Sequence, residues 1–238
     1  DKILSTSHVM AEKTSFYTDK NITVTPFGID LNVFKKEKIS REKLSPFKDS
    51  DIVVGTVKLL EKKYGINFLI EAFSHLSEKY PEIPLKLLIV GDGNERKPLE
   101  KMVENLDLKD KVHFTGMVSH LQVSQYHKII DIFAALSEEE SFGVAIVEAG
   151  ACEKPVVVSD AGGLPEVVDD GVTGFVVERK NSYAASKALE ILVLDEELRV
   201  RMGVAGRKRV EKLYKWKDNV DMMVDIYKNI LEMKRKNR

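Results

Sequence analysis

The feature that most constrains the fold is an alternation of short apolar runs with amphipathic helical patterns, which continues from about residue 50 to residue 177. The apolar runs predicted as strands are residues 52–54, 85–90, 112–114, 132–136, 156–159 and 175–177. Strands that are buried on both faces have nearly continuous apolar sequences, and intervening helices return the chain to the same edge of a sheet. The pattern therefore predicts an α/β fold, an open parallel sheet with helices on both faces.

Both ends of the chain depart from this alternation. Two helices are predicted at 182–194 and 196–214, and a C-terminal helix carries an apolar stripe at spacings of four, three, four and three residues, formed by Trp216, Val220, Met223, Tyr227 and Ile230. Near the start, residues 22–26 indicate an isolated strand before a turn at 27–30. The charged, irregular residues 35–49 indicate a connection that takes no part in the core.

Charge and cysteine content exclude several classes of protein. The chain has 37 basic and 38 acidic residues, so no overall field favours nucleic acid. The single cysteine, Cys152, excludes an intrachain disulfide framework, fits a small buried residue and is consistent with a cytoplasmic location. No apolar run reaches the length of a membrane span. The basic tail at 234–238 is interpreted as the end of a helix, with peripheral attachment to the inner face of a membrane as the alternative.

The most specific local pattern is a pair of glutamates, Glu140 and Glu148, with seven residues between them. The pattern predicts that Glu140 lies on the loop after the strand at 132–136 and that Glu148 lies inside the following helix. Ligands of open α/β sheets bind outside the carboxyl ends of the strands, where two carboxylates could accept hydrogen bonds from a polyol. The alternative is a solvated acidic loop and an ordinary polar helix position.

Two lysines, Lys58 and Lys63, follow the first strand of the alternation and precede a helix. Ammonium groups beside a helix N-terminus suit a diphosphate, although loop lysines are commonly only solvated charges. The sequence has neither G-x-G-x-x-G after this strand nor a phosphate-loop motif, which argues against the usual dinucleotide and NTPase sites. No metal-ligand or Ser-His-Asp pattern is present, and the five scattered histidines, among them His127, are interpreted as ordinary structural residues.

Taken together, these motifs resemble the C-terminal, donor-binding domain of retaining glycosyltransferases of family four, which have the two-domain GT-B architecture. The resemblance covers residues 1–227 and is carried by motifs in the family's order, at 26–30, 55–65, 90–93, 114–116, 140–148, 155–157 and 162–166. It implies a Rossmann-like sheet that forms one half of a GT-B fold. The chain departs from the family pattern at Lys58, Phe27 and Glu153, where Arg, Asn and Gly are usual.

The resemblance also implies roles for individual residues. Glu148 would bind the ribose of the nucleotide, Glu140 would face the transferred sugar, and the pair Lys58 and Lys63 would hold the diphosphate without a metal ion. Backbone groups would contact the sugar, the phosphate and the base at Phe142, Gly143, Val144, Gly91 and Val118. The substrate would be a nucleotide-diphospho-sugar such as a UDP- or GDP-sugar, and no cofactor is expected.

The domain organisation follows from the same resemblance. Residues 1–20 would be the tail of a missing N-terminal acceptor domain, residues 21–214 the nucleotide-sugar-binding domain, and residues 215–238 a helix that crosses back to the N-terminal domain. The expected reaction transfers a hexose-type sugar, with retention of configuration, to a glycan or lipid-linked acceptor that the missing domain binds. The alternatives are a non-catalytic nucleotide-sugar-binding subunit and a nucleotide-sugar epimerase of the same architecture.

Overall fold

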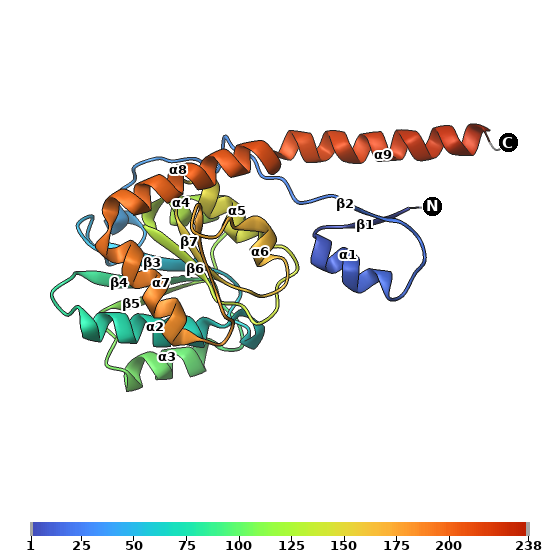
Figure 1. Cartoon of the computed structure of the whole chain (residues 1–238). Coiled ribbons are helices and arrows are strands. Elements are labelled where there is room, and N and C mark those ends of the chain that lie inside the picture. The colour runs from blue at the N-terminus through green and yellow to red at the C-terminus, as the bar shows by residue number, and fades with distance from the viewer. Residues whose placement is uncertain (1, 237–238) are drawn as a thin grey trace.

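The computed structural model describes residues 2–236, and its centre is a sheet of six parallel strands in the order β5-β4-β3-β6-β7-β8 (Figure 1). The strands are β3 (Ile52–Val57), β4 (Leu85–Val90), β5 (Val112–Gly116), β6 (Ile132–Ala135), β7 (Val156–Ser159) and β8 (Gly174–Val177). Every pairing between neighbouring strands is parallel. The predicted α/β fold with an open parallel sheet is confirmed.

Helices cover both faces of this sheet. They are α2 (Ile66–Lys79), α3 (Arg96–Asn105), α4 (His120–Ile129), α5 (Val144–Ala151), α6 (Leu164–Val167), α7 (Ser182–Leu194) and α8 (Glu196–Leu213). Helices α2, α3 and α7 bury their apolar residues in one core cluster, and α4, α5 and α6 bury theirs in the other. Helix α8 contributes Met202 to the first cluster and Val210 to the second. Burial on both sides explains why the strands are almost entirely apolar.

A small N-terminal unit lies beside the sheet domain, below α9 in Figure 1. It consists of β1 (Ile3–Ser5), α1 (His8–Ser15) and β2 (Ile22–Val24). The prediction that residues 22–26 form an isolated strand is wrong, because β2 pairs in parallel with β1. The carboxylate of Glu166 in α6 accepts hydrogen bonds of 2.8 Å from the backbone amides of His8 and Val9. This unit is therefore bonded to the sheet domain through the first turn of α1.

The prediction that residues 35–49 take no part in the core is also wrong. Phe47 is buried in the core beneath α4 and contacts the ring of His113 edge-on. The guanidinium of Arg41 donates to the backbone oxygen of Ile129 at 2.9 Å and to the carboxylate of Asp131 at 2.5 Å. An irregular, charged stretch thus connects two parts of the chain and also packs against the end of a core helix.

The chain crosses itself where the N-terminal unit joins the sheet domain and where α9 (Trp216–Lys236) begins. The amide of Ile29 donates to the oxygen of Tyr214 at 2.9 Å, and the amide of Trp216 donates to the oxygen of Ile29 at 3.0 Å. Beyond this crossing, α9 projects away from the body (Figure 1) and leaves most of its large apolar side chains exposed. Of the predicted basic tail, Asn237 and Arg238 lie outside the described residues.

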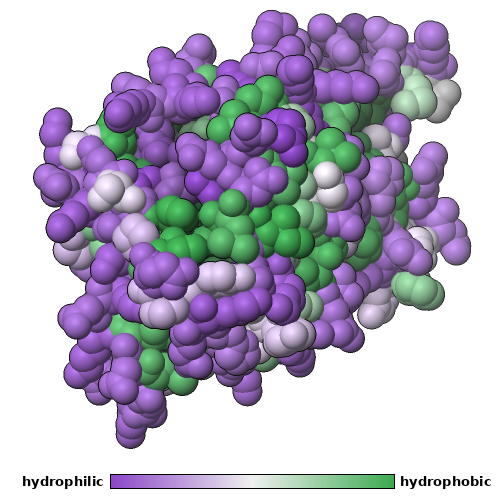
Figure 2. All heavy atoms as spheres, turned by 60° about the vertical axis from the view of Figure 1, so that its left-hand side comes forward, coloured by the Kyte–Doolittle hydropathy of each residue, from purple (hydrophilic) through white to green (hydrophobic). Residues whose placement is uncertain are grey.

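No helix among residues 2–236 is long and apolar enough to cross a bilayer. The face shown in Figure 2 is largely hydrophilic, with a band of hydrophobic residues across its middle.

Candidate functional site

The candidate site lies at the carboxyl ends of β3 and β6, which are neighbours in the sheet although β4 and β5 separate them in sequence. At this point the order of the strands reverses direction, and open α/β sheets bind ligands in the crevice outside such a point. Lys58 directly follows β3, and Glu140 stands on the loop after β6. The topology therefore brings together two residues that the sequence separates by 82 positions.

The ammonium of Lys58 forms an ion pair with the carboxylate of Glu140. Both side chains are shielded from solvent, with 18% and 11% of their surfaces exposed. The ring of Tyr64 supports this pair, because the Nζ atom of Lys58 lies 4.3 Å from its centroid and that of Lys63 lies 5.2 Å away. Two cations close to one aromatic ring form a compact positive site. The sequence carried no signal for Tyr64, which only the folded loop brings close to both lysines.

Backbone contacts hold the loop that carries Glu140. The carbonyl oxygen of Lys63 accepts from the amides of Glu138 and Glu139 at 2.8 and 3.3 Å, and that of Glu140 accepts from Gly163 at 3.1 Å. Gly162 has a φ of +51°, and a Cβ atom there would lie only 1.7 Å from the oxygen of Glu140. The predicted glycine cluster at 162–166 thus permits a close approach between two loops of the site.

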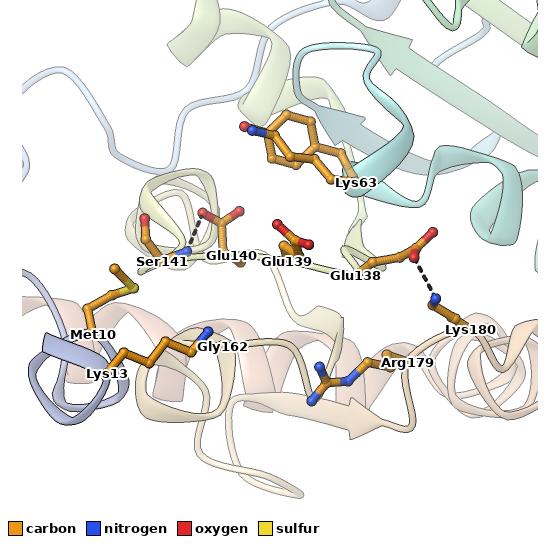
Figure 3. Close-up of a pocket in the computed structure, with 11 residues that line it drawn as sticks. Met10, Lys13, Lys63, Glu138, Glu139, Glu140, Ser141, Gly162, Arg179 and Lys180 are labelled. Atoms are coloured by element: carbon orange, nitrogen blue, oxygen red, sulfur yellow. Dashed lines mark hydrogen bonds and ion pairs between the residues drawn. The ribbon is translucent and has the colours of Figure 1, made fainter. Parts of the chain in front are cut away.

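A cavity of about 680 Å³ opens beside this loop (Figure 3). Its walls come from α1, from the loops after β3, β6 and β7, and from the segment after β8: Met10, Lys13, Lys63, Tyr64, Glu138, Glu139, Glu140, Ser141, Gly162, Arg179 and Lys180. In Figure 3, Lys13 and Arg179 reach toward the acidic loop from the opposite wall. The cavity is lined mainly by polar and charged groups, which suits a hydroxyl-rich ligand.

Of the predicted site residues, only Lys63 and Glu140 line this cavity. The sequence analysis missed the other basic residues that line it, Lys13, Arg179 and Lys180. Lys180 pairs with Glu138 at 2.7 Å, and Arg179 pairs with Asp160 at 2.9 Å. Burial opposes the ionised form of Asp160, but hydrogen bonds from the backbone and guanidinium of Arg179 outweigh it and lower the pKa of Asp160. Asp160 follows β7, Arg179 and Lys180 follow β8, and Lys13 lies in the remote helix α1, so no local motif connects them.

Glu148 lies in α5 and points into a buried environment instead of the cavity. Its side chain is 10% exposed, and its Oε2 atom lies 3.1 Å from Nε2 of the fully buried His127 in α4. The interpretation of His127 as an ordinary structural residue is therefore incomplete, because it contacts a candidate ligand-binding carboxylate. A single histidine in the amphipathic pattern at 121–130 gave no indication of this partner.

The loop between the two glutamates can serve a ligand through its backbone. The side chain of Phe142 is buried and contacts the rings of Phe27 and Tyr214, with centroids 5.6 and 5.7 Å apart. Gly143 caps α5 with a φ of +108°, and Val144 is the first residue of the helix. The first amides of a helix have no partner within it. The first amides of α5 are thus without a partner within the helix, and the contact of Gly143 and Val144 with a ligand stays a prediction.

Gly91 and Val118, predicted to lie near the base, follow β4 and β5 on the other side of β3 from the cavity. The amide of Gly91 donates to the oxygen of Gly116 at 3.1 Å. A Cβ atom on Gly91 would lie 1.9 Å from the oxygen of Lys58, so this glycine lets the loops after β3 and β4 touch. Val118 is half-buried against the core. The contact of Gly91 and Val118 with a base stays a prediction.

Among residues 2–236 there is no group of three or more His, Cys, Asp or Glu side chains arranged to hold a metal ion. The concentrated positive charge at the end of β3 comes from Lys58 and Lys63.

Comparison with known proteins agrees with the fold. The chain matches the family model described as "Glycosyl transferases group 1" over residues 36–209, which is most of its length. The chain therefore belongs to the group 1 glycosyl transferases. Its sheet is the Rossmann-like half of a GT-B fold, and the resemblance inferred from the sequence is confirmed.

One relative is the N-acetyl-alpha-D-glucosaminyl L-malate synthase of Bacillus anthracis, which is 29% identical over 234 residues, covering 97% of this chain and 60% of the relative. The sucrose-phosphate synthase of Thermosynechococcus elongatus superposes with a TM-score of 0.89 at 26% identity, covering 98% of this chain and 59% of that structure. HepE of Anabaena, solved in complex with UDP and glucose, superposes with a TM-score of 0.82 at 24% identity, covering 95% of this chain and 62% of its own. The chain thus spans about 60% of these proteins.

Proposed function

We propose that the chain is the donor-binding part of a retaining glycosyltransferase that moves a hexose-type sugar from a nucleotide-diphospho-sugar to a glycan or lipid-linked acceptor. The observation that carries the proposal is the shielded Lys58–Glu140 pair beside Lys63, at the reversal point of the sheet and at the mouth of a polar cavity. A fixed positive group next to a hydroxyl-accepting carboxylate suits the junction between a phosphate and a sugar.

In the proposed binding mode, the diphosphate lies over Lys58 and Lys63 and the first amides of α5. These groups favour negative charge through their ammonium ions and through the helix N-terminus. The sugar extends along the loop that carries Glu140 into the cavity, where the carboxylate accepts from a sugar hydroxyl. The ribose lies toward Glu148, and the base lies near Gly91 and Val118. UDP bound to HepE supports a nucleotide on this fold.

The chemistry proposed for these residues is electrostatic. Departure of the nucleotide leaves additional negative charge on the phosphate next to the broken glycosidic bond. Lys58 and Lys63 stabilise that charge from fixed positions, which lowers the barrier without the reorganisation that water would need. The Lys58–Glu140 pair keeps the ammonium oriented before the ligand arrives. In this proposal the arrangement needs no metal ion.

We also propose that the protein acts in the cytoplasm, at or near the inner face of a membrane.

Calorimetric titration of the chain with UDP, GDP and ADP tests the donor site. We expect saturable binding of one nucleotide, with a loss of at least tenfold in affinity in Glu148→Ala, since a hydrogen bond to a charged group contributes about 1.5–3 kcal/mol. In Lys63→Ala we expect a loss of about five- to tenfold, because the Lys63 side chain is exposed and its charge is screened. The matched controls are Glu104→Ala and Lys109→Ala, which remove an exposed ion pair of 2.8 Å next to the amino end of β5.

Unchanged binding in the controls and loss in the two site variants would support the proposal. Equal affinities in all four variants would place the nucleotide elsewhere and refute the residue assignments. Binding of no nucleotide by the wild-type chain would refute the donor site in this chain. Retention itself is tested by the anomeric configuration of the product that the complete protein forms, because an inverted product contradicts the proposed reaction.

A further inference from the structure

The buried contact between His127 and Glu148 has a consequence for how the donor is recognised. The two side chains come from α4 and α5, and they meet through Nε2 and Oε2 at 3.1 Å. The imidazole is inaccessible to solvent, and it packs against the rings of Phe34 and Phe133 at centroid distances of 6.0 and 5.2 Å. Aromatic walls on two sides leave the imidazole little freedom to turn.

The chemistry of the two groups fixes the direction of the hydrogen bond. An ionised carboxylate only accepts hydrogen bonds, so Nε2 of His127 must carry the proton and donate to Glu148. The other ring nitrogen, Nδ1, is buried and has no hydrogen-bond partner within residues 2–236. A hydrogen on Nδ1 would be buried without an acceptor, which agrees with a hydrogen on Nε2 that is directed at Glu148. His127 therefore occupies Oε2 of Glu148 and leaves Oε1 for a ligand.

We propose that His127 is a positioning residue that holds the Glu148 carboxylate ready to accept hydrogen bonds from the ribose hydroxyls of the donor. The proposal rests on the proposed function, because it needs a nucleotide at Glu148. A free glutamate side chain loses rotamer freedom when it is fixed, and a partner that fixes it before binding removes that cost from the binding step. His127 itself contacts no ligand.

The test compares two nucleotides that differ only in the groups Glu148 would contact. UDP and 2′,3′-dideoxy-UDP are titrated into the wild-type chain, into His127→Asn and into His127→Gln, with the guanosine pair used instead if GDP is the nucleotide bound. The amide nitrogen of glutamine reaches about as far as Nε2 of histidine, whereas that of asparagine corresponds to Nδ1 and falls short of Glu148. The two variants thus differ in reach while both place an amide in the same buried space.

We expect the wild type to prefer UDP over the dideoxy compound by about tenfold or more, as the loss of hydrogen bonds to a charged group implies. His127→Asn should reduce that preference to about twofold, and His127→Gln should keep most of it. The control is His113→Asn. His113 lies in β5, packs against Phe47 and contacts neither glutamate in the described structure. This control should leave the preference unchanged.

A general structural defect lowers the affinities for both nucleotides by the same factor and leaves their ratio intact, and that result in His127→Asn would overturn the proposal. Thermal denaturation establishes that each variant is folded. If His127→Asn does not fold, His127→Gln decides, because a folded glutamine variant that has lost the preference contradicts the positioning role. A wild type that binds none of UDP, GDP and ADP overturns the proposed function, whereas one that binds its nucleotide and the dideoxy form of that nucleotide equally overturns only this inference.

Discussion

Removal of the Lys58 ammonium should weaken binding of a nucleoside diphosphate more than removal of the Lys63 ammonium. In the structure, Lys58 offsets the charge of Glu140, and the two side chains are 18% and 11% exposed. Lys58→Met removes one attraction to the diphosphate and also leaves an uncompensated carboxylate beside it. Two unit charges about 6 Å apart interact by about 3 kcal/mol at an effective dielectric constant near 20. Solvent screening reduces this value, so we expect a loss of about 2–3 kcal/mol, or about 30- to 150-fold in affinity.

The Lys63 side chain is exposed, and its charge is screened accordingly. Lys63→Met should therefore cost about 1–1.5 kcal/mol, roughly tenfold in affinity at most. The double variant Lys58→Met/Glu140→Gln removes the uncompensated charge and should recover about 1–2 kcal/mol relative to Lys58→Met alone. Calorimetry at one fixed ionic strength measures all three, with Lys109→Met as the control. Equal losses in the two single variants, or a double variant no better than Lys58→Met, would refute the electrostatic argument.

Two further predictions concern stability and reactivity. Gly162→Ala should lower the free energy of unfolding by about 3 kcal/mol and the melting temperature by about 6–12 °C, because the new Cβ atom would lie 1.7 Å from the oxygen of Glu140. The matched change is Gly171→Ala, at a φ of +75° with no atom within 4 Å of the new Cβ. It should lower the free energy of unfolding by only about 1 kcal/mol. Similar melting temperatures for the two variants would contradict this reasoning. Burial raises the pKa of the Cys152 thiol to about 11, so only about 0.1% is thiolate at pH 8. Alkylation of the native chain should be at least 100-fold slower than that of the urea-unfolded chain and should accelerate about tenfold per pH unit up to pH 10; equal rates would show that the thiol is accessible.

The sheet could be predicted from the sequence because most of its strands are buried on both faces and are therefore almost entirely apolar. The same rule failed at the N-terminus, where β1 and β2 are short, half-buried and separated by α1. Helix α6 has four residues, too few for an apolar stripe to recur. The role of residues 35–49 was misjudged for another reason. Phe47 is one aromatic residue in a charged stretch, and its burial depends on a surface that α4 and β5 form far along the chain.

The candidate site was predictable to the extent that the edge of the sheet defines it. Lys58, Lys63 and Glu140 could be placed together because residues after neighbouring parallel strands meet at one edge. Their partners could not be predicted. Tyr64 is positioned by a single turn of 3-10 helix between β3 and α2, and no periodic pattern marks such a turn. His127 is one of five histidines, and only its contact with Glu148 distinguishes it.

The two glutamates of one motif acquire different environments because different units of the fold supply their partners. Glu140 stands on the loop beside β3, where the sheet order reverses, so it meets the lysines that follow that strand. Glu148 lies further along α5, on the face that packs against α4, so it meets a buried histidine instead. The motif places one glutamate before α5 and the other inside it, whereas the neighbouring units determine the partners of each. A shielded ion pair keeps Glu140 beside a cation, and the contact with His127 leaves Glu148 with one oxygen that the proposed binding mode assigns to hydroxyl groups.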